Sequence, residues 1–298
     1  MSKRKPLILG VGEILWDMLP GGKMLGGAPA NFAYHCSQLG AESIVVSAIG
    51  SDDPGSEILQ NLERLNLSTD ALSIEENHPT STVTVRLDAQ GHPEYTIHEN
   101  VAWDHIPSKH KVVDLVRGAD AICYGSLAQR SPLSRQTIQS YLEQTNDECL
   151  RIFDVNLRQH YYSKEVLESS LGFANVLKLN DEELVILAEL FSLKGDENEM
   201  IRSMQQSYDL KLIALTRGGD GATLFNGSER SDYRAEAVDA VDTVGAGDSF
   251  TAAMVMGYLN GKNLNEMNRL AADIAAFVCT QKGATPAIPS DLLSEINS

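Results

Sequence analysis

Residues 241–250, which read Val-Asp-Thr-Val-Gly-Ala-Gly-Asp-Ser-Phe, join a short apolar segment to a long run of small and apolar residues typical of a buried helix. Gly245 and Gly247 let the backbone turn sharply and leave no Cβ in front of the amides. Free N–H groups at a helix start bind anions, aided by the helix dipole. Asp248 lies in the first turn, where a carboxylate could take a proton from a hydroxyl that attacks phosphorus.

A purely structural interpretation explains the same residues. The helix dipole alone favours an aspartate in a first turn, and Gly-Ala-Gly can be no more than a tight turn. From the residues of this stretch, an anion site and a simple helix start are equally supported.

A second glycine-rich helix start lies near the N-terminus. Gly26 and Gly27 precede Pro29, which suits a first helical turn, and the helix is predicted to run to Leu39. Asn31 is a mediocre helix former among small residues, so it is either a ligand contact or a satisfied core amide. For Asp17 the residues favour a turn position over a contact with sugar hydroxyls.

The order of strands and helices predicts an α/β fold with a doubly wound, mostly parallel sheet. The predicted strands of this sheet are residues 7–12, 44–49, 119–124, 150–155, 176–179 and 212–216. Residues 82–87 and 94–98, joined by a turn at 88–93, form a hairpin that does not suit a helix-flanked parallel sheet. With residues 14–19 they predict a small antiparallel sheet.

Two nucleotide-binding folds are disfavoured. The first predicted strand ends in Gly10-Val11-Gly12, but Leu15 stands where a dinucleotide fold has its third glycine, which argues against a nicotinamide dehydrogenase. The chain also lacks Gly-x-x-x-x-Gly-Lys-Ser/Thr, which argues against a P-loop fold.

Bulk properties indicate a cytoplasmic globular protein. The 298 residues are 43% apolar and 22% charged, and the formal net charge is -17. This charge argues against nucleic-acid partners and anionic membrane surfaces. Four scattered cysteines predict neither a zinc site nor a disulfide framework. The N-terminal apolar run is too short for a signal sequence or a membrane span.

Both glycine-rich stretches resemble signatures of the ribokinase-like, or phosphofructokinase-B, carbohydrate kinases. Asp242 to Asp248 fits the family pattern Asp-Thr-x-Gly-Ala-Gly-Asp, and Gly26 to Ala33 fits Gly-Gly-x-x-x-Asn-x-Ala. The form Gly-Glu…Asp…Gly-Gly-Ala-Pro-Ala-Asn-x-Ala is most similar to the fructokinase branch. The resemblance covers nearly the whole chain. It implies a single kinase domain, 1–298, with a lid formed by roughly 13–25 and 81–106.

The resemblance also implies roles for individual residues. Asp248 would be the catalytic base, and the amides of Gly245, Ala246 and Gly247 would form the anion hole. Arg158, in an Asp-x-Asn-x-Arg stretch, would reach the substrate or the transferring phosphate. The residues implied to bind the sugar are Asp17, Gly26, Gly27, Asn31, Arg158 and Asp248.

Nucleotide and cation sites follow from the same resemblance. The residues implied to contact the nucleotide are Asn180, Thr216, Gly218, Gly219, Gly221, Gly245 and Gly247. Glu183 would organise Mg²⁺ through water, and a K⁺ ion would lie near Asp242, Val244 and Gly283. Structural interpretations exist here too, since Asn180 and Glu183 are spaced as a capping box and residues 216–221 suit a hairpin loop.

The predicted activity is ATP-dependent phosphorylation of the primary hydroxyl of a small sugar, with D-fructose as the best single acceptor. Ribose, a nucleoside or 2-keto-3-deoxygluconate are alternatives within the family. A non-catalytic nucleotide or sugar sensor is a more distant alternative, which the presence of Asp248 disfavours. The resemblance further implies a homodimer that forms through the lid.

Overall fold

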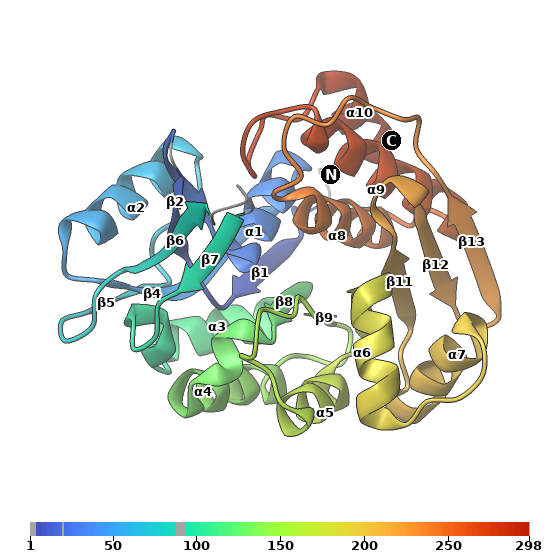
Figure 1. Ribbon diagram of the computed structural model, residues 1–298, viewed down its shortest axis with the longest axis horizontal. Coiled ribbons are helices and arrows are strands. Elements are labelled where there is room, and N and C mark those ends of the chain that lie inside the picture. The colour runs from blue at the N-terminus through green and yellow to red at the C-terminus, as the bar shows by residue number, and fades with distance from the viewer. Residues whose placement is uncertain (1–3, 20, 88–92, 298) are drawn as a thin grey trace.

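The computed structural model describes residues 4–19, 21–87 and 93–297 of the chain. Within these residues a large sheet carries helices on both faces, and a smaller sheet stands beside one end of it (Figure 1). The α/β fold class predicted from the sequence is therefore confirmed. Pro20 and residues 88–92 of the predicted hairpin turn lie outside the described residues.

The large sheet has nine strands among the described residues. In spatial order they are β13 (Glu229–Tyr233), β12 (Ala222–Asn226), β11 (Leu212–Thr216), β10 (Val176–Asn180), β9 (Leu150–Asp154), β8 (Ala121–Gly125), β1 (Leu7–Val11), β4 (Glu42–Gly50) and β5 (Leu72–Glu75). All neighbours pair in parallel except at β11–β12 and β12–β13, which are antiparallel. The chain order reverses at β1, between β4 and β8, and open α/β sheets bind ligands beyond the strand ends near such a point.

Two layers of helices bury the faces of this sheet. One core contains residues of α3 (His110–Gly118), α4 (Pro132–Glu143), α5 (Lys164–Phe173), α6 (Asp181–Phe191) and α7 (Glu197–Tyr208). The other contains residues of α1 (Ala28–Gln38), α8 (Ala246–Leu259), α9 (Leu264–Cys279) and α10 (Ser290–Asn297). Strand β8 shows why both form, because Ile122 and Tyr124 enter the first core and Ala121 and Cys123 enter the second.

The smaller sheet has the order β3 (Gly22–Gly26), β2 (Leu15–Leu19), β6 (Ser81–Leu87) and β7 (Pro93–Ile97). Its outer pairs, β2–β3 and β6–β7, are antiparallel, and its central pair β2–β6 is parallel. Helix α2 (Asp53–Arg64) covers part of it, since Ile58 and Leu62 pack in one cluster with Trp16.

In the described part of the chain, three short 3₁₀ helices complete the elements: η1 (Ala102–His105), η2 (Leu127–Arg130) and η3 (Gly218–Asp220). No helix within the described ranges is both long enough and apolar enough to cross a lipid bilayer.

Helix α1 lies directly on strand β1 at one glycine. A Cβ added at Gly10 would stand 2.1 Å from the carbonyl oxygen of Pro29 and 3.4 Å from the Cβ of Ala33. The strand and the helix thus approach as closely as their backbones allow. This contact sets the position of the first turn of α1 relative to the carboxyl edge of the sheet.

We expect Gly10→Ala to lower the free energy of unfolding by about 2 kcal/mol, because the added methyl group forces the α1 backbone off β1. Chemical denaturation measures the change. Gly172→Ala is the matched control, because no atom of the described residues lies within 4 Å of a Cβ at Gly172 in α5. There the same substitution should be neutral or stabilise by up to about 1 kcal/mol. Equal stability of the two variants would contradict the assigned close contact.

Candidate active site

Helix α8 begins at Gly245 with the backbone in the left-handed region, at φ 80°. Among the residues that the structure describes, no side chain caps this helix start, and the Ala246 amide makes a single long backbone hydrogen bond, 3.3 Å, to the Thr243 carbonyl. The first turn contains Asp248, as the sequence predicted. The start of α8 is therefore a set of backbone amides with a carboxylate beside them, and such a set of amides is able to bind an anion.

The first turn of α1 meets the first turn of α8. The side-chain amide nitrogen of Asn31 donates a hydrogen bond of 2.8 Å to Oδ2 of Asp248. Asn31 is buried, and its Oδ1 has no partner among the described residues. A buried carbonyl oxygen without a donor is costly, so this atom is suited to accept a hydrogen bond from a ligand hydroxyl.

The environment of Asp248 makes its carboxyl group less acidic than an ordinary aspartate. Burial and the nearby Asp154 carboxylate raise its pKa to about 6, while Asn31, Lys178 and Arg158 oppose that shift. A base whose pKa lies slightly below neutrality is ionised at pH 7 and still accepts a proton.

Asp17, a residue of β2, lies close enough to Arg158 and Asp242 for their charges to act on it. Burial raises its pKa to about 6, and the positive charge of Arg158 opposes the shift. A Cβ at Gly26 would stand 2.3 Å from Oδ2 of Asp17, so only a glycine at position 26 leaves room for this carboxylate. Gly27, with φ 113°, caps α1 and lies against the Glu13 carbonyl.

A third carboxyl group, which the sequence analysis did not single out, lies nearby. Glu13 is 2% exposed, and its Oε2 has no hydrogen-bond partner among the described residues. Burial raises its pKa to about 7, with Arg158 lowering it and Asp248 raising it. Glu13 follows the Gly-x-Gly turn without any periodic signal, so only its position in space marks it as part of the site.

A buried ion pair lies beneath the start of α8. Lys178 Nζ is 3.1 Å from Oδ1 of Asp154, and a Cβ at Gly247 would be 3.1 Å from the same nitrogen. Burial disfavours the lysine's charge, but the carboxylates of Asp154, Glu183 and Asp248 outweigh this and raise its pKa. Thr251 Oγ1 donates to the other Asp154 oxygen at 3.2 Å. The ammonium group of Lys178 therefore lies next to Gly247, in the first turn of α8.

Asn180 and Glu183 form the capping box that their spacing predicted. Glu183 Oε2 accepts from the Asn180 amide, and Asn180 Oδ1 accepts from the Glu183 amide, both at 2.8 Å. Glu183 Oε1 also accepts from the amide of Leu157 at 2.9 Å, which ties α6 to the segment that carries Arg158. The Arg158 side chain itself is exposed.

The loop after β11 leaves open space for a ligand. Within the described part of the chain, no atom lies within 4 Å of a Cβ added at Gly218 or Gly219, and Gly218 takes φ 51°. Gly221 closes the hairpin, since its carbonyl accepts from the Arg217 amide at 2.8 Å. Thr216 makes a long hydrogen bond, 3.4 Å, to the Leu179 carbonyl of the adjacent strand.

The three residues predicted near a K⁺ ion lie together. Asp242 Oδ1 accepts from the Val244 amide and its Oδ2 accepts from the Gly283 amide, both at 3.0 Å. One carboxylate thus holds two loops side by side at the start of α8.

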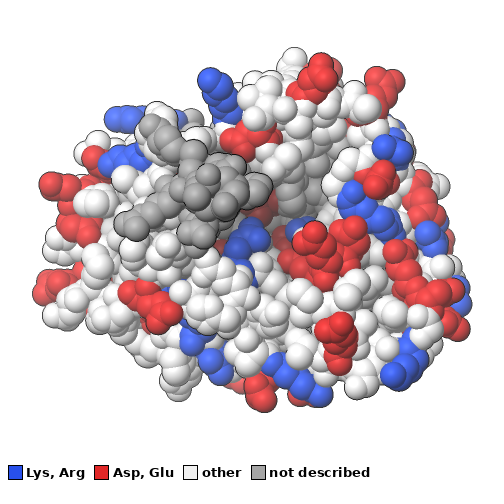
Figure 2. All heavy atoms as spheres, viewed as in Figure 1, with Lys and Arg blue, Asp and Glu red and all other residues white. Residues whose placement is uncertain are grey.

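The molecular surface is hollowed near the middle of the face shown in Figure 2, with acidic and basic side chains around the hollow.

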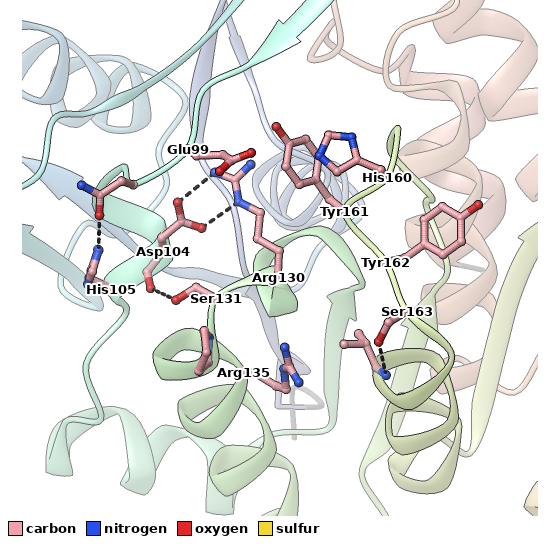
Figure 3. A pocket seen from close by; sticks show the side chains of 13 residues that line it. Glu99, Asp104, His105, Arg130, Ser131, Arg135, His160, Tyr161, Tyr162 and Ser163 are labelled. Carbon is pink, nitrogen blue, oxygen red and sulfur yellow. Dashed lines mark hydrogen bonds and ion pairs between the residues drawn. The ribbon is translucent and has the colours of Figure 1, made fainter.

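A further pocket of about 490 Å³ is lined by other residues than those predicted for phosphoryl transfer (Figure 3). Its wall contains Arg130, which makes two hydrogen bonds of 2.8 Å to Asp104 and donates to the His98 carbonyl at 2.6 Å. Tyr161 donates to the Ile97 carbonyl at 3.0 Å, so this cluster anchors the end of β7.

Known proteins are similar to this chain in both sequence and fold. The family model for pfkB family carbohydrate kinases matches residues 21–291. A protein of Arabidopsis thaliana named probable fructokinase-4 is 31% identical, over 99% of this chain and 96% of its own length. The fructokinase of Salmonella typhimurium is 30% identical, over 94% of this chain and 95% of its own length.

Among solved structures, an uncharacterized sugar kinase of Pyrococcus horikoshii in complex with ATP is 27% identical. It superimposes with a TM-score of 0.81 and covers 97% of this chain and 99% of its own. The two signatures that meet at Asn31 and Asp248 thus occur in a chain whose whole length matches known kinases. The chain belongs to the pfkB family of carbohydrate kinases and is an ATP-dependent sugar kinase.

Proposed function

We propose that this kinase phosphorylates the primary hydroxyl of a small neutral sugar, and that D-fructose is its acceptor. The observation that carries the proposal is the hydrogen bond from Asn31 to Asp248. It places the predicted base beside a buried acceptor atom, Asn31 Oδ1, that has no partner among the described residues. A sugar hydroxyl supplies the donor that this atom needs.

The charges around the acceptor position favour a neutral sugar over an anionic one. Three carboxyl groups, those of Glu13, Asp17 and Asp248, have raised pKa values, and Arg158 opposes the shift in each case. The carboxylates of the protein accept hydrogen bonds from sugar hydroxyls, whereas a carboxylate on the substrate would be repelled by them. This supports fructose over 2-keto-3-deoxygluconate, and the two relatives named fructokinase point the same way.

The proposed transfer step uses the chain's own groups. Asp17, Gly27 and Asn31 bind the sugar, and Asp248 removes the proton from the primary hydroxyl. The oxygen attacks the γ-phosphorus of ATP while the bond from that phosphorus to the β,γ-bridging oxygen breaks, and ADP leaves. The amides of Gly245, Ala246 and Gly247 stabilise the charge on the transferring group together with Arg158. Lys178, behind Gly247, adds a fixed positive potential at the same point.

For the nucleotide, we propose the loop of Thr216, Gly218, Gly219 and Gly221 together with Asn180. The open space at Gly218 and Gly219 supports this, because it lets a ligand approach the backbone closely. We also propose that the four-stranded sheet forms a lid over the sugar and belongs to the same kinase domain as the large sheet. A homodimer that forms through the outer face of this lid stays a prediction.

The described residues also fit the predicted cations. Mg²⁺ is usually held by phosphates and water with one or two carboxylates, and no cluster of three or more metal-ligating side chains lies within the described ranges. Glu183 would hold the ion through water, since each oxygen accepts one backbone amide and keeps a further lone pair. Bound there, Mg²⁺ would neutralise phosphate charge. The junction of Asp242, Val244 and Gly283 would hold K⁺.

The acceptor is tested by coupled ADP-release assays with Mg·ATP and a panel of fructose, ribose, adenosine and 2-keto-3-deoxygluconate. We expect kcat/KM for fructose to exceed that for the sugar acid by about 100-fold, because like charges at close range cost several kcal/mol. Preference for the sugar acid would reject the proposed acceptor and leave the family assignment intact. ATP binding without turnover on any acceptor would favour the sensor alternative.

Asp248→Asn should lower kcat by about 10³-fold, because a positioned general base contributes 10²- to 10⁴-fold. Asp120→Asn is the control, since Asp120 binds the Leu7 amide at the opposite edge of the sheet. It removes one carboxylate and should leave kcat unchanged. A near-normal kcat in the Asp248 variant, with wild-type thermal stability, would rule out the assigned base.

The pH dependence of kcat/KM should show an acid limb near pH 6, about two pH units above the range of an ordinary aspartate. Activity is lost as pH falls through this value, because protonated Asp248 cannot accept a proton. Asn31→Ala removes a hydrogen bond that favours the ionised form, so the limb should move up by about one pH unit. A limb that stays in place, or moves down, would contradict the coupling of the two residues.

A further inference from the structure

His35 is a fully buried histidine one helical turn after Asn31 in α1. It is 0% exposed, and its Nε2 lies 2.8 Å from the carbonyl oxygen of Ala284. Residues four apart on a helix share one face, so Asn31 and His35 point toward the same region from successive turns.

The protonation of His35 follows from its surroundings. Burial lowers its pKa to about 4, and the hydrogen bond to Ala284 opposes that shift. The ring is therefore neutral near pH 7 and carries one N–H. Because a carbonyl oxygen only accepts, this proton is on Nε2, and Nε2 donates to Ala284.

The other ring nitrogen shows that a histidine at this position has an energetic cost. Nδ1 is buried and has no partner among the described residues. An apolar side chain at position 35 would fill the core without an unsatisfied polar atom of its own, but it would leave the buried Ala284 carbonyl without this donor. The imidazole is therefore explained by its N–H donor, which reaches the Ala284 carbonyl in the loop between α9 and α10.

Ala284 in turn lies directly behind the start of α8. A Cβ at Gly245 would stand 2.6 Å from the Ala284 carbonyl oxygen, 2.7 Å from its Cα and 2.8 Å from its Cβ. The Ala284 backbone thus packs on the glycine whose φ of 80° lets α8 begin. Asp242 holds the preceding residue, Gly283, on one side, and His35 holds Ala284 on the other.

We propose that His35 is a positioning residue for phosphoryl transfer, because it holds Ala284 against Gly245 and so keeps the amides of the anion hole and Asp248 in place. Helix α1 then controls the start of α8 at two points. Asn31 orients the carboxylate of Asp248 directly, and His35 supports the turn before it through Ala284.

The test compares His35→Leu with His35→Gln. A glutamine places its amide nitrogen near the position of the histidine Nε2 and can donate to the Ala284 carbonyl, whereas leucine fills the space without a donor. Tyr124→Phe is the matched control, because it removes another buried 2.8 Å hydrogen bond from a side chain to a backbone carbonyl, that of Ser170. Thermal unfolding confirms that each variant is folded.

The first readout is hydrogen exchange of peptides that cover residues 242–250. We expect exchange of these amides to rise at least tenfold in His35→Leu and to stay within threefold of wild type in His35→Gln and Tyr124→Phe. Unchanged exchange in His35→Leu would overturn the proposal. So would equal increases in His35→Leu and Tyr124→Phe, because the effect would then be a general loss of stability.

The second readout is steady-state kinetics, which rests on the proposed function. His35→Leu should lower kcat about 10- to 100-fold with the acceptor KM within threefold, since Asp17 and Gly27 are not displaced, and His35→Gln should restore most of kcat. Loosened amides without a fall in kcat would overturn the role in turnover. If wild type phosphorylates no neutral sugar, the proposed function fails, and the exchange experiment still decides whether His35 holds this turn.

Discussion

The hydrogen bond between Asn31 and Asp248 requires two helices to begin at the same place. Helices α1 and α8 come from opposite ends of the chain, and each begins at a glycine with positive φ. Their first turns can meet only if α1 lies flat on β1, where Gly10 removes the side chain that would separate them. The geometry of the site thus depends on close backbone packing in the sheet below it.

The fold was predictable because its signals are local. Apolar strands that alternate with helices, glycines at helix starts and the capping box at Asn180 and Glu183 can each be recognised from a few neighbouring residues. The structure confirms each of these features. Strand β3 was not predicted as a strand, since it contains glycines at both ends and is defined by its pairing with β2. The predicted roles of individual site residues remain predictions, although the structure brings Asn31 and Asp248 into contact.

The residues that sequence reasoning missed share one property, which is burial of a polar group by elements far apart in the chain. Glu13 follows a tight turn, and His35 stands within an ordinary helical pattern. Neither has a spacing that distinguishes it from a surface residue. Their surroundings, and so their shifted pKa values, exist only after the sheet and helices are assembled.

The contact between Gly10 and Pro29 bears on how a mutational scan of this enzyme would be interpreted. Position 10 has no room for a single methyl group, so it should tolerate substitution as poorly as position 248. Tolerance alone would therefore not separate the chemistry of the site from the packing that supports it. Abundance and turnover would have to be scored separately, because a change at Gly10 is expected to deplete folded protein, whereas loss of the proposed base in Asp248→Asn is expected to lower turnover and leave the protein folded.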